Sequence, residues 1–178
     1  MDLEEKKISG EVVYNGKLLE VHKDEILCPN GNKAYREYIE KIPAAAVIAK
    51  VDGKFIFEKQ FRYPFHDVLI EIPAGKCDKH EDPINTAKRE LEEETGFLAK
   101  NIKFLGKCLP SVPYTSEVIH LYYASDLEKT HTHLDENEFV EVFYLTEDEV
   151  IKKIKNGEIS DAKTVQAFAL YLLNKESL

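Results

Sequence analysis

The chain has 178 residues, of which 43% are apolar and 32% are charged, a mixture typical of a folded domain and too apolar for a disordered chain. Its 33 acidic residues against 24 basic ones give a net charge of −9, which argues against nucleic acid or an anionic membrane as a partner. The sequence contains no transmembrane-length apolar run and does not begin like a secretory leader. Its three cysteines are widely spaced and form no CxxC pair, so we expect a reduced, cytoplasmic protein.

The first half of the chain is predicted to consist of strands joined by tight turns. The pairs Asn15-Gly16, Asn30-Gly31 and Asp52-Gly53 separate apolar or alternating runs and are typical of hairpin turns. Residues 44–49 show little polar alternation, so this strand should be central and covered on both faces. The predicted strands are residues 11–14, 18–27, 34–41, 44–51, 54–61 and 69–72.

The second half mixes helices and strands. A helix is predicted over 83–95, because Asp82 can cap its first turn and Gly96 can end it. Two further helices are expected at 146–155 and 161–173, the last with Ser160 as its N-cap. The strands 103–109, 118–125 and 138–145 are predicted between the first helix and these two, with a polar loop over 126–137. The pattern predicts a mixed α/β domain over 43–178, preceded by an antiparallel β-rich arm over 1–42.

The predicted helix over 83–95 concentrates acidic side chains on one face. Glu90, Glu93 and Glu94 stand at i, i+3 and i+4, where their carboxylates converge and repel one another. Such stretches are commonly solvated faces. The alternative is a site for a hard divalent cation, Mg²⁺ or Mn²⁺, which prefers oxygen ligands. Arg89, one turn before Glu93, can offset part of the repulsion and orient that side chain.

A longer pattern around this helix favours the metal-site alternative. The chain matches every fixed position of G-x5-E-x7-R-E-U-x-E-E-x-G-U, in which U is bulky and apolar. The matching residues are Gly75, Glu81, Arg89, Glu90, Leu91, Glu93, Glu94, Gly96 and Phe97. The chain therefore resembles the Nudix hydrolases, which split a nucleoside diphosphate linked to another moiety. The resemblance implies an α/β/α sandwich around a mixed sheet.

The resemblance also implies roles for individual residues. Glu90 and Glu94 correspond to the principal metal ligands, Glu93 assists in binding and catalysis, and the carbonyl of Ala74 completes the coordination. Mg²⁺ is the implied cofactor and Mn²⁺ a possible substitute. The motif over residues 75–97 is called the Nudix box. In related ADP-ribose pyrophosphatases, a loop outside this box supplies a general base and a further metal ligand. Glu136 and Glu138 match those positions, although a solvated acidic loop is the plain alternative.

The substrate class has to be inferred from residues outside the Nudix box. The segment Gln60-Phe61-Arg62, followed by 69–75, looks like the approach to the box in ADP-ribose and nucleotide-sugar pyrophosphatases. Arg62 would offer paired donors to a diphosphate, with Glu71 beside it; the alternative is an ion pair of Arg62 with Glu71 or Asp67.

Two further segments resemble that subfamily. Residues 111–117 are similar to its S-P-G-x-[ST]-x-E loop, which makes Ser111, Tyr114 and Glu117 candidate substrate contacts. The chain departs from the pattern at positions 112 and 113, where Val and Pro replace the usual Pro and Gly. Related enzymes exchange N-terminal strands within a homodimer, so Arg36 and Tyr14 are candidates for a shared nucleoside pocket; an arm packed on its own subunit is the alternative.

The resemblance thus predicts Mg²⁺-dependent hydrolysis of ADP-ribose or a related nucleoside diphosphate sugar, giving nucleoside monophosphate and sugar phosphate. The alternatives are other Nudix substrates, such as GDP-mannose, a dinucleoside polyphosphate, capped RNA or an oxidised nucleotide. A non-catalytic nucleotide-sugar sensor is a third possibility, which retention of all the box glutamates disfavours.

Overall fold

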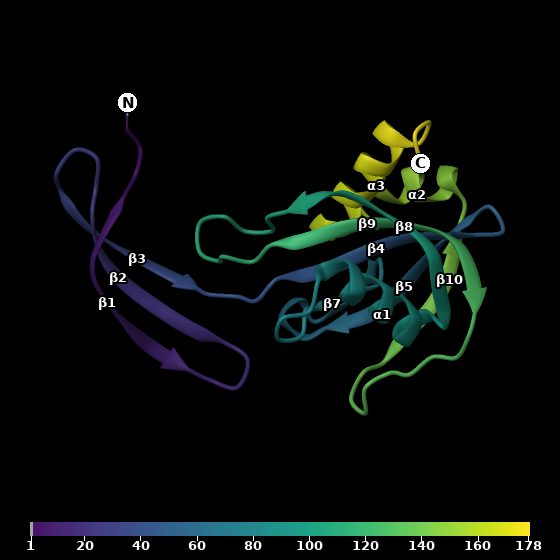
Figure 1. Cartoon of the computed structure of the whole chain (residues 1–178), viewed down its shortest axis with the longest axis horizontal. Helices are drawn as coiled ribbons and strands as arrows, with labels where there is room; N and C mark the ends of the chain where they lie inside the picture. The colour runs from purple at the N-terminus through teal and green to yellow at the C-terminus, as the bar shows by residue number, and fades with distance from the viewer. Residues whose placement is uncertain (1) are drawn as a thin grey trace. The chain divides into compact units, whose positions relative to one another are not determined.

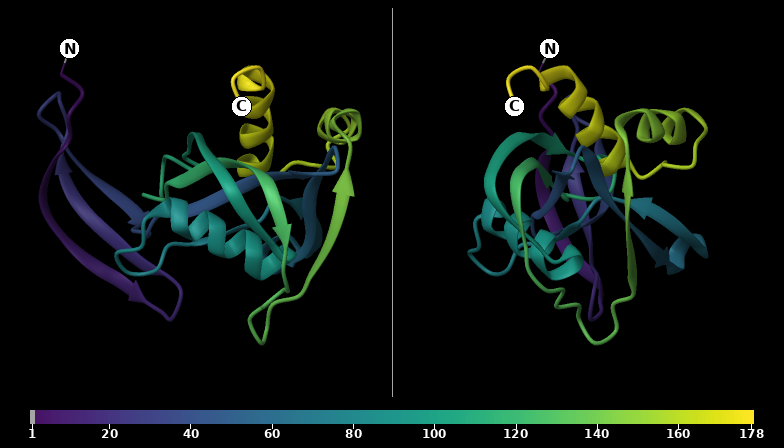
Figure 2. Two further views of the ribbon diagram at one scale, coloured as in Figure 1. Left: turned by 45° about the vertical axis from the view of Figure 1, so that its right-hand side comes forward. Right: turned by 90° about the vertical axis from the view of Figure 1, so that its right-hand side faces the viewer.

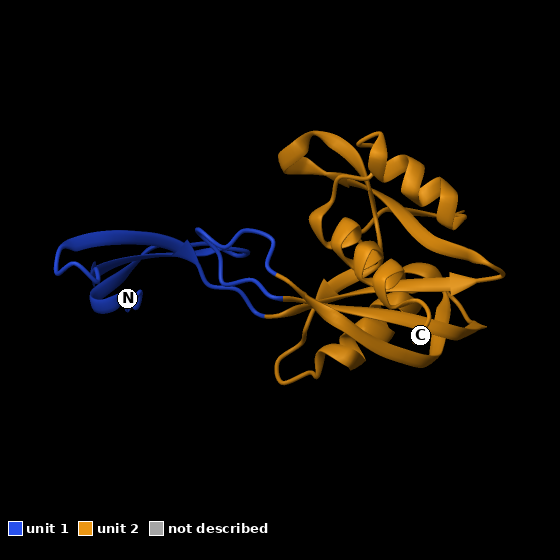
Figure 3. Cartoon of the chain, turned by 90° about the horizontal axis from the view of Figure 1, so that it is seen from above, with its two compact units in different colours: residues 1–42, 109–118 blue, residues 43–108, 119–178 orange. Residues whose placement is uncertain are grey.

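The computed structural model describes residues 2–178 (Figure 1). They form two compact units, coloured separately in Figure 3. The first unit contains the residues up to 42 together with Leu109–Val118, and the second contains Pro43–Cys108 and Ile119–Leu178. Residues 109–118, which the sequence assigned to the second domain, therefore cluster with the arm. Within the described residues, no helix is both long and apolar enough to cross a bilayer.

The first unit is built around a three-stranded antiparallel sheet in the order β1-β2-β3. Its strands are β1 (Lys6–Asn15), β2 (Glu20–Leu27) and β3 (Lys33–Ile39). β1 is exposed along its length and begins at Lys6, earlier than predicted, because its pairing with β2 extends to Lys6 opposite Leu27. The segment 109–118 joins this unit through a bridge between Ile39 and Thr115.

The second unit contains a seven-stranded mixed sheet. Five strands follow the order β10-β5-β4-β9-β8, while β6 pairs with β5 and β7 with β4. The pair β4–β9 is parallel and the other pairs are antiparallel. The strands are β4 (Ala44–Val51), β5 (Lys54–Arg62), β6 (Asp67–Glu71), β7 (Ala74–Lys76), β8 (Phe97–Cys108), β9 (Ile119–Lys129) and β10 (Val140–Leu145), with a 3₁₀ turn over Tyr63–Phe65.

Three helices cover this sheet on both faces, as Figure 2 shows for α1 (Pro83–Thr95) and α3 (Ala162–Asn174). Alternate residues of β4 pack on opposite sides: Ala45 and Val47 face the α1 layer, while Ala46 and Ile48 face α3 and α2 (Glu147–Lys155). The prediction of a central strand covered on both faces is confirmed. The architecture is the expected α/β/α sandwich around a mixed sheet.

The local signals explain most element boundaries. Asp82 caps α1 by accepting from the N–H of Ile84, and Gly96 ends the helix at φ 70°, a conformation that glycine adopts without steric cost. At α3 the prediction was wrong by one residue, since Asp161, not Ser160, is the N-cap and accepts from the N–H of Thr164. Asp52 and Gly53 both have positive φ, as a two-residue hairpin turn requires.

Other strands also differ from the predictions, among them β8, which begins at Phe97 and not at residue 103. β9 continues to Lys129, so the predicted loop is too long at its start, because antiparallel pairing reaches Phe97 opposite Lys129 despite the polar sequence. β10 begins at Val140, later than predicted. The short strand β7 was not predicted, and it forms because Ala74, Gly75 and Lys76 pair with the start of β4.

Candidate active site

Two elements position the box residues of the site: the strand β7 and the helix α1 that follows it. Glu94 is 2% exposed, and its Oε2 accepts a hydrogen bond from the N–H of Ala74 at 3.0 Å. Glu90 and Glu93 lie on the same helix and are half-buried. The backbone N–H of Ala74 and the carboxylate of Glu94 are thereby held together, and the carbonyl of Ala74 as a metal ligand stays a prediction.

Arg89 joins the acidic side chains of α1 to the loop before it. Its Nη1 donates to Glu90 Oε1 at 2.7 Å and to Glu93 Oε2 at 2.9 Å. On the other side, Nε and Nη2 donate to Glu81 at 3.3 and 3.2 Å, and Nη2 also donates to the carbonyl of Lys76 at 3.1 Å. The hydrogen bonds from Arg89 lower the pKa of Glu81 to about 2. Arg89 therefore orients the acids rather than facing solvent.

Gly75 leaves room for Glu90. A Cβ atom built on Gly75 would lie 1.9 Å from Oε1 and 2.0 Å from Cδ of Glu90, distances that no side chain tolerates. The first glycine of the motif therefore allows the Glu90 carboxylate to lie against the backbone of β7, and a side chain there would displace it.

We expect the substitution Gly75→Ala to displace Glu90 and to weaken Mn²⁺ binding by about tenfold or more, since outer contacts of metal ligands carry effects of that size. Calorimetric titration with Mn²⁺ measures it. Gly106→Ala is a matched control, because a Cβ there would meet only the terminal Cδ1 of Leu170, at 3.0 Å. Equal Mn²⁺ affinity in the two variants would contradict this role of Gly75.

The negative charges of the box glutamates on α1 are unfavourable in the absence of a cation. Burial raises the pKa of Glu94 to about 10, and the charges of Glu58, Glu90 and Glu138 add to the effect. Burial also raises the pKa of Glu90, against the opposing effect of Arg89. A divalent cation would reverse these shifts, and the donors are all oxygen atoms, which fits Mg²⁺ or Mn²⁺.

The acidic side chains are not preassembled as a ligand cage. Within residues 2–178, no group of three or more acidic, histidine or cysteine side chains is arranged so that it could hold a metal ion. The hydrogen bonds explain this arrangement, because Arg89 holds Glu90 and Glu93 while the N–H of Ala74 holds Glu94. Metal binding would require these side chains to turn toward the cation.

The loop before β10 supplies the other predicted acids. Glu138 is half-buried, its Oε1 lies 3.5 Å from Nε2 of Gln60, and its charge acts on Glu90 and Glu94. The structure thus brings Glu138 to the box glutamates. Glu136 is exposed and lines a surface hollow with Asp135, Asn137 and Glu138. Its assignment as general base stays a prediction.

Arg62, whose side chain is 38% exposed, belongs to an ion-pair cluster in which Glu71 and Lys163 are buried. Its Nε and Nη2 donate to the two carboxylate oxygens of Glu71 at 2.6 and 2.8 Å. Lys163 also donates to Glu71, and to Asp161 at 3.0 Å. Burial opposes the ionisation of Glu71, but the hydrogen bond from Arg62 and the charge of Lys163 outweigh it, so the pKa of Glu71 is lowered. The ion pair of Arg62 with Glu71, anticipated as the alternative to phosphate binding, is present.

The remaining predicted substrate contacts belong to the first unit. Arg36 donates to Glu5 at 2.9 Å and to the carbonyl of Tyr35 at 3.0 Å. In the segment 109–118, the carbonyl of Ser111 accepts from Thr115 at 3.2 Å, and that of Tyr114 accepts from Ile39 at 2.8 Å. The N–H of Glu117 donates to Thr115 Oγ1 at 3.2 Å. These contacts shape the loop and leave its proposed contacts with substrate untested.

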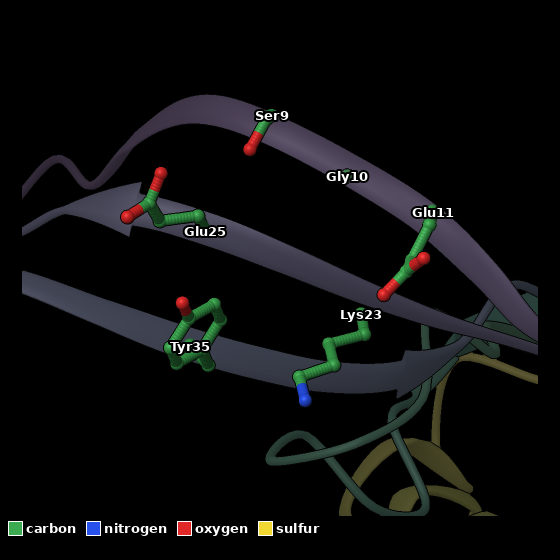
Figure 4. A pocket seen from close by; sticks show the side chains of 6 residues that line it. All are labelled: Ser9, Gly10, Glu11, Lys23, Glu25 and Tyr35. Atoms are coloured by element: carbon green, nitrogen blue, oxygen red, sulfur yellow. The ribbon is translucent and has the colours of Figure 1, made fainter.

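A hollow on the three-stranded sheet is lined by other residues (Figure 4): Ser9, Gly10, Glu11, Lys23, Glu25 and Tyr35. The ammonium of Lys23 lies 5.1 Å from the centre of the Tyr35 ring, a cation–π contact. The hollow thus carries its own aromatic and charged groups, apart from the candidate residues Arg36 and Tyr14.

Comparison with known proteins decides the family. The NUDIX domain family matches residues 40–168. The ADP-ribose pyrophosphatase of Bacillus subtilis is 41% identical over 99% of this chain and 96% of its own length. The chain belongs to the Nudix family. It is a pyrophosphohydrolase of the Nudix type, as the motif indicated.

Two other relatives extend the comparison. The methanol dehydrogenase activator of Bacillus methanolicus is 41% identical over 98% of this chain and 96% of its own length. A crystal structure of an ADP compounds hydrolase superposes with a TM-score of 0.89, at 22% identity, and covers 99% of this chain and 98% of that one. The structural likeness confirms the fold across both units of this Nudix protein.

One buried acid whose charge acts on a box glutamate, Glu58, was not predicted from the sequence. It is 1% exposed, on β5, and its charge acts on Glu94. The signal was present, since strand alternation places Glu58, Gln60 and Arg62 on one face. It was overlooked because Glu58 lies outside the box.

Proposed function

We propose that this Nudix protein hydrolyses the pyrophosphate bond of ADP-ribose or a related nucleoside diphosphate sugar with Mg²⁺, releasing nucleoside monophosphate and sugar phosphate. The observation that carries the proposal is the buried carboxylate of Glu94, held beside the backbone of Ala74 among other acids. The full-length likeness to an ADP-ribose pyrophosphatase supports the substrate class.

In this mechanism the chain's own residues hold the reactants. The carboxylates of Glu90, Glu93, Glu94 and Glu138 and the carbonyl of Ala74 would hold the cation. When bound, Mg²⁺ supplies charge neutralisation of the diphosphate and lowers the pKa of a coordinated water. Arg89 holds Glu90 and Glu93 beside one another through two hydrogen bonds, from which both carboxylates would turn toward the cation.

The remaining roles concern proton transfer and substrate recognition. Glu136, on an exposed loop, accepts the proton of the attacking water, a role that suits an acid able to move in with substrate. Glu71 fixes the guanidinium plane of Arg62 for contact with a phosphate oxygen. Ser111, Tyr114, Glu117 and Arg36 contact the sugar and nucleoside, in a cytoplasmic homodimer that shares the N-terminal strands.

A substrate screen tests the proposal. The purified protein with Mg²⁺ is incubated with ADP-ribose, GDP-mannose, ADP-glucose, NADH and diadenosine polyphosphates, and mononucleotide release is followed by chromatography. We expect the highest kcat/KM on ADP-ribose or another nucleoside diphosphate sugar, and none after chelation of the metal. Activity restricted to diadenosine polyphosphates would contradict the substrate class, and undiminished activity with chelator would contradict the role of the cation.

A second candidate function follows from the relative named as a methanol dehydrogenase activator, whose identity to this chain is equally high. The same preparation should therefore be added to a methanol dehydrogenase assay. Stimulation of that enzyme would favour the second function, and hydrolysis of a free nucleotide sugar without stimulation would favour the first.

A further inference from the structure

Glu58 lies in the interior of the second unit on the side of the sheet that faces α1. On β5, Phe55 and Phe57 pack into the core beneath α3, whereas Ile56 packs into the core beneath α1. Because side chains alternate along a strand, Glu58 shares the face of Ile56. Its side chain is therefore directed to the layer that carries the box glutamates.

The carboxylate of Glu58 is buried without a full set of partners. The residue is 1% exposed, and its Oε2 atom is buried and has no hydrogen-bond partner. A buried, unpaired carboxylate is costly, and an apolar residue at such a position is commonly more stabilising. The retention of an acid here therefore points to a role other than stability.

The neighbouring cations do not account for Glu58. Glu71 stands opposite Glu58 in the β5–β6 register. Arg62 directs its hydrogen bonds to Glu71, and Lys163 directs its own to Glu71 and Asp161. Their charges favour ionisation of Glu58, but burial and the charge of Glu71 outweigh them and raise the pKa of Glu58 to about 7.

Besides Glu71, Lys163 and Arg62, the charges that interact with Glu58 are those of acids of the proposed metal site. Of the neighbouring charges, that of Glu58 has the largest effect on Glu94, and Glu138 acts on both. Carboxylates from β5, from α1 and from the loop before β10 therefore surround one region, two of them nearly fully buried.

We propose that Glu58 is a metal ligand outside the Nudix box, contributing a carboxylate oxygen to the cation held by Glu94. The proposal rests on the metal dependence of the proposed function. It assigns β5 a direct part in the site, in addition to presenting Arg62. It also explains why a buried acid directly follows the apolar run Phe55-Ile56-Phe57 of β5.

The test compares Glu58→Gln with Glu141→Gln in Mn²⁺ binding. Glutamine keeps the size of the side chain and removes the charge. Glu141 is a matched control on the adjacent strand β10, because its side chain is 68% exposed and pairs with Lys59. Calorimetric titration of each full-length variant should show about tenfold weaker Mn²⁺ binding for Glu58→Gln. Wild-type affinity is expected for Glu141→Gln.

Thermal unfolding of the metal-free variants completes the test. Metal-free Glu58→Gln is expected to unfold at or above the wild-type temperature at pH 8, because an uncompensated buried acid has been removed. A lower temperature would show that the fold itself uses the carboxylate and would overturn the proposal. So would wild-type Mn²⁺ affinity in Glu58→Gln when Glu94→Gln has lost it, an outcome that leaves the proposed function intact. Failure of the wild-type protein to bind Mn²⁺ would overturn both.

Discussion

Replacing Glu94 by glutamine is expected to lower kcat for nucleotide-sugar hydrolysis by about a thousandfold, the order seen when a principal electrostatic group of an active site is removed. The fold should be retained. In the metal-free protein the pKa of Glu94 is raised to about 10, so the side chain is mainly neutral at pH 7.5. Glutamine is also neutral and can still accept the hydrogen bond from the N–H of Ala74.

The measurement is steady-state hydrolysis with Mg²⁺, together with circular dichroism and thermal unfolding of both proteins. Glu92→Gln is the matched control, since Glu92 lies on the same helix and is half-buried but occupies a variable position of the motif. We expect it to keep wild-type kcat. If Glu94→Gln retained kcat within tenfold of the wild type, Glu94 could not be a principal metal ligand.

The sequence predicts the acidic helix well because each of its signals is local. Asp82, Pro83 and Gly96 mark its ends, and helical geometry alone brings Glu90 next to Glu94. The spacing also implies the contact of Arg89 with Glu93, which the structure shows at 2.9 Å. Features determined by neighbours in the chain can be read without tertiary structure.

The buried charges could not be predicted in the same way. Lys163 follows Glu71 by 92 positions and meets it only because α3 begins beside the end of β6. In the sequence Glu58 does not differ from an exposed acid of a strand, and its near-complete burial results from tertiary packing. Such contacts depend on the topology of the sheet, which one sequence does not specify.

Gly75 could be predicted from the sequence only in part. The motif identifies it as fixed, but only the structure gives the reason, which is the Glu90 carboxylate against its Cα. The strand β7 was missed because three residues carry no periodicity, and its pairing with β4 is what holds Gly75 and Ala74 beneath α1. The sequence thus named the residues, and the tertiary pairing explains their positions.

Replacing Glu71 by glutamine is expected to destabilise the protein by about 3–5 kcal/mol, because it removes one partner of a buried ion-pair cluster. The variant leaves Lys163, which is 8% exposed, with Asp161 as its remaining acidic hydrogen-bond partner, and Arg62 loses both carboxylate oxygens. For a chain of this length, the corresponding fall in unfolding temperature is about 10 °C. Urea denaturation at pH 7 measures the free energy of unfolding directly.

The pH dependence separates lost charge pairing from lost packing. The pKa of Glu71 is lowered in the folded protein, so its contribution is present above the unfolded pKa of about 4.5 and disappears as the pH falls through the folded value. The difference in the free energy of unfolding between wild type and Glu71→Gln should therefore become smaller at acidic pH. Glu141→Gln, which breaks the exposed pair with Lys59, should cost less than about 1 kcal/mol at pH 7. If Glu71→Gln cost no more than that control, the cluster would be structurally neutral, and the fixed orientation of Arg62 would be the reason for the buried acid.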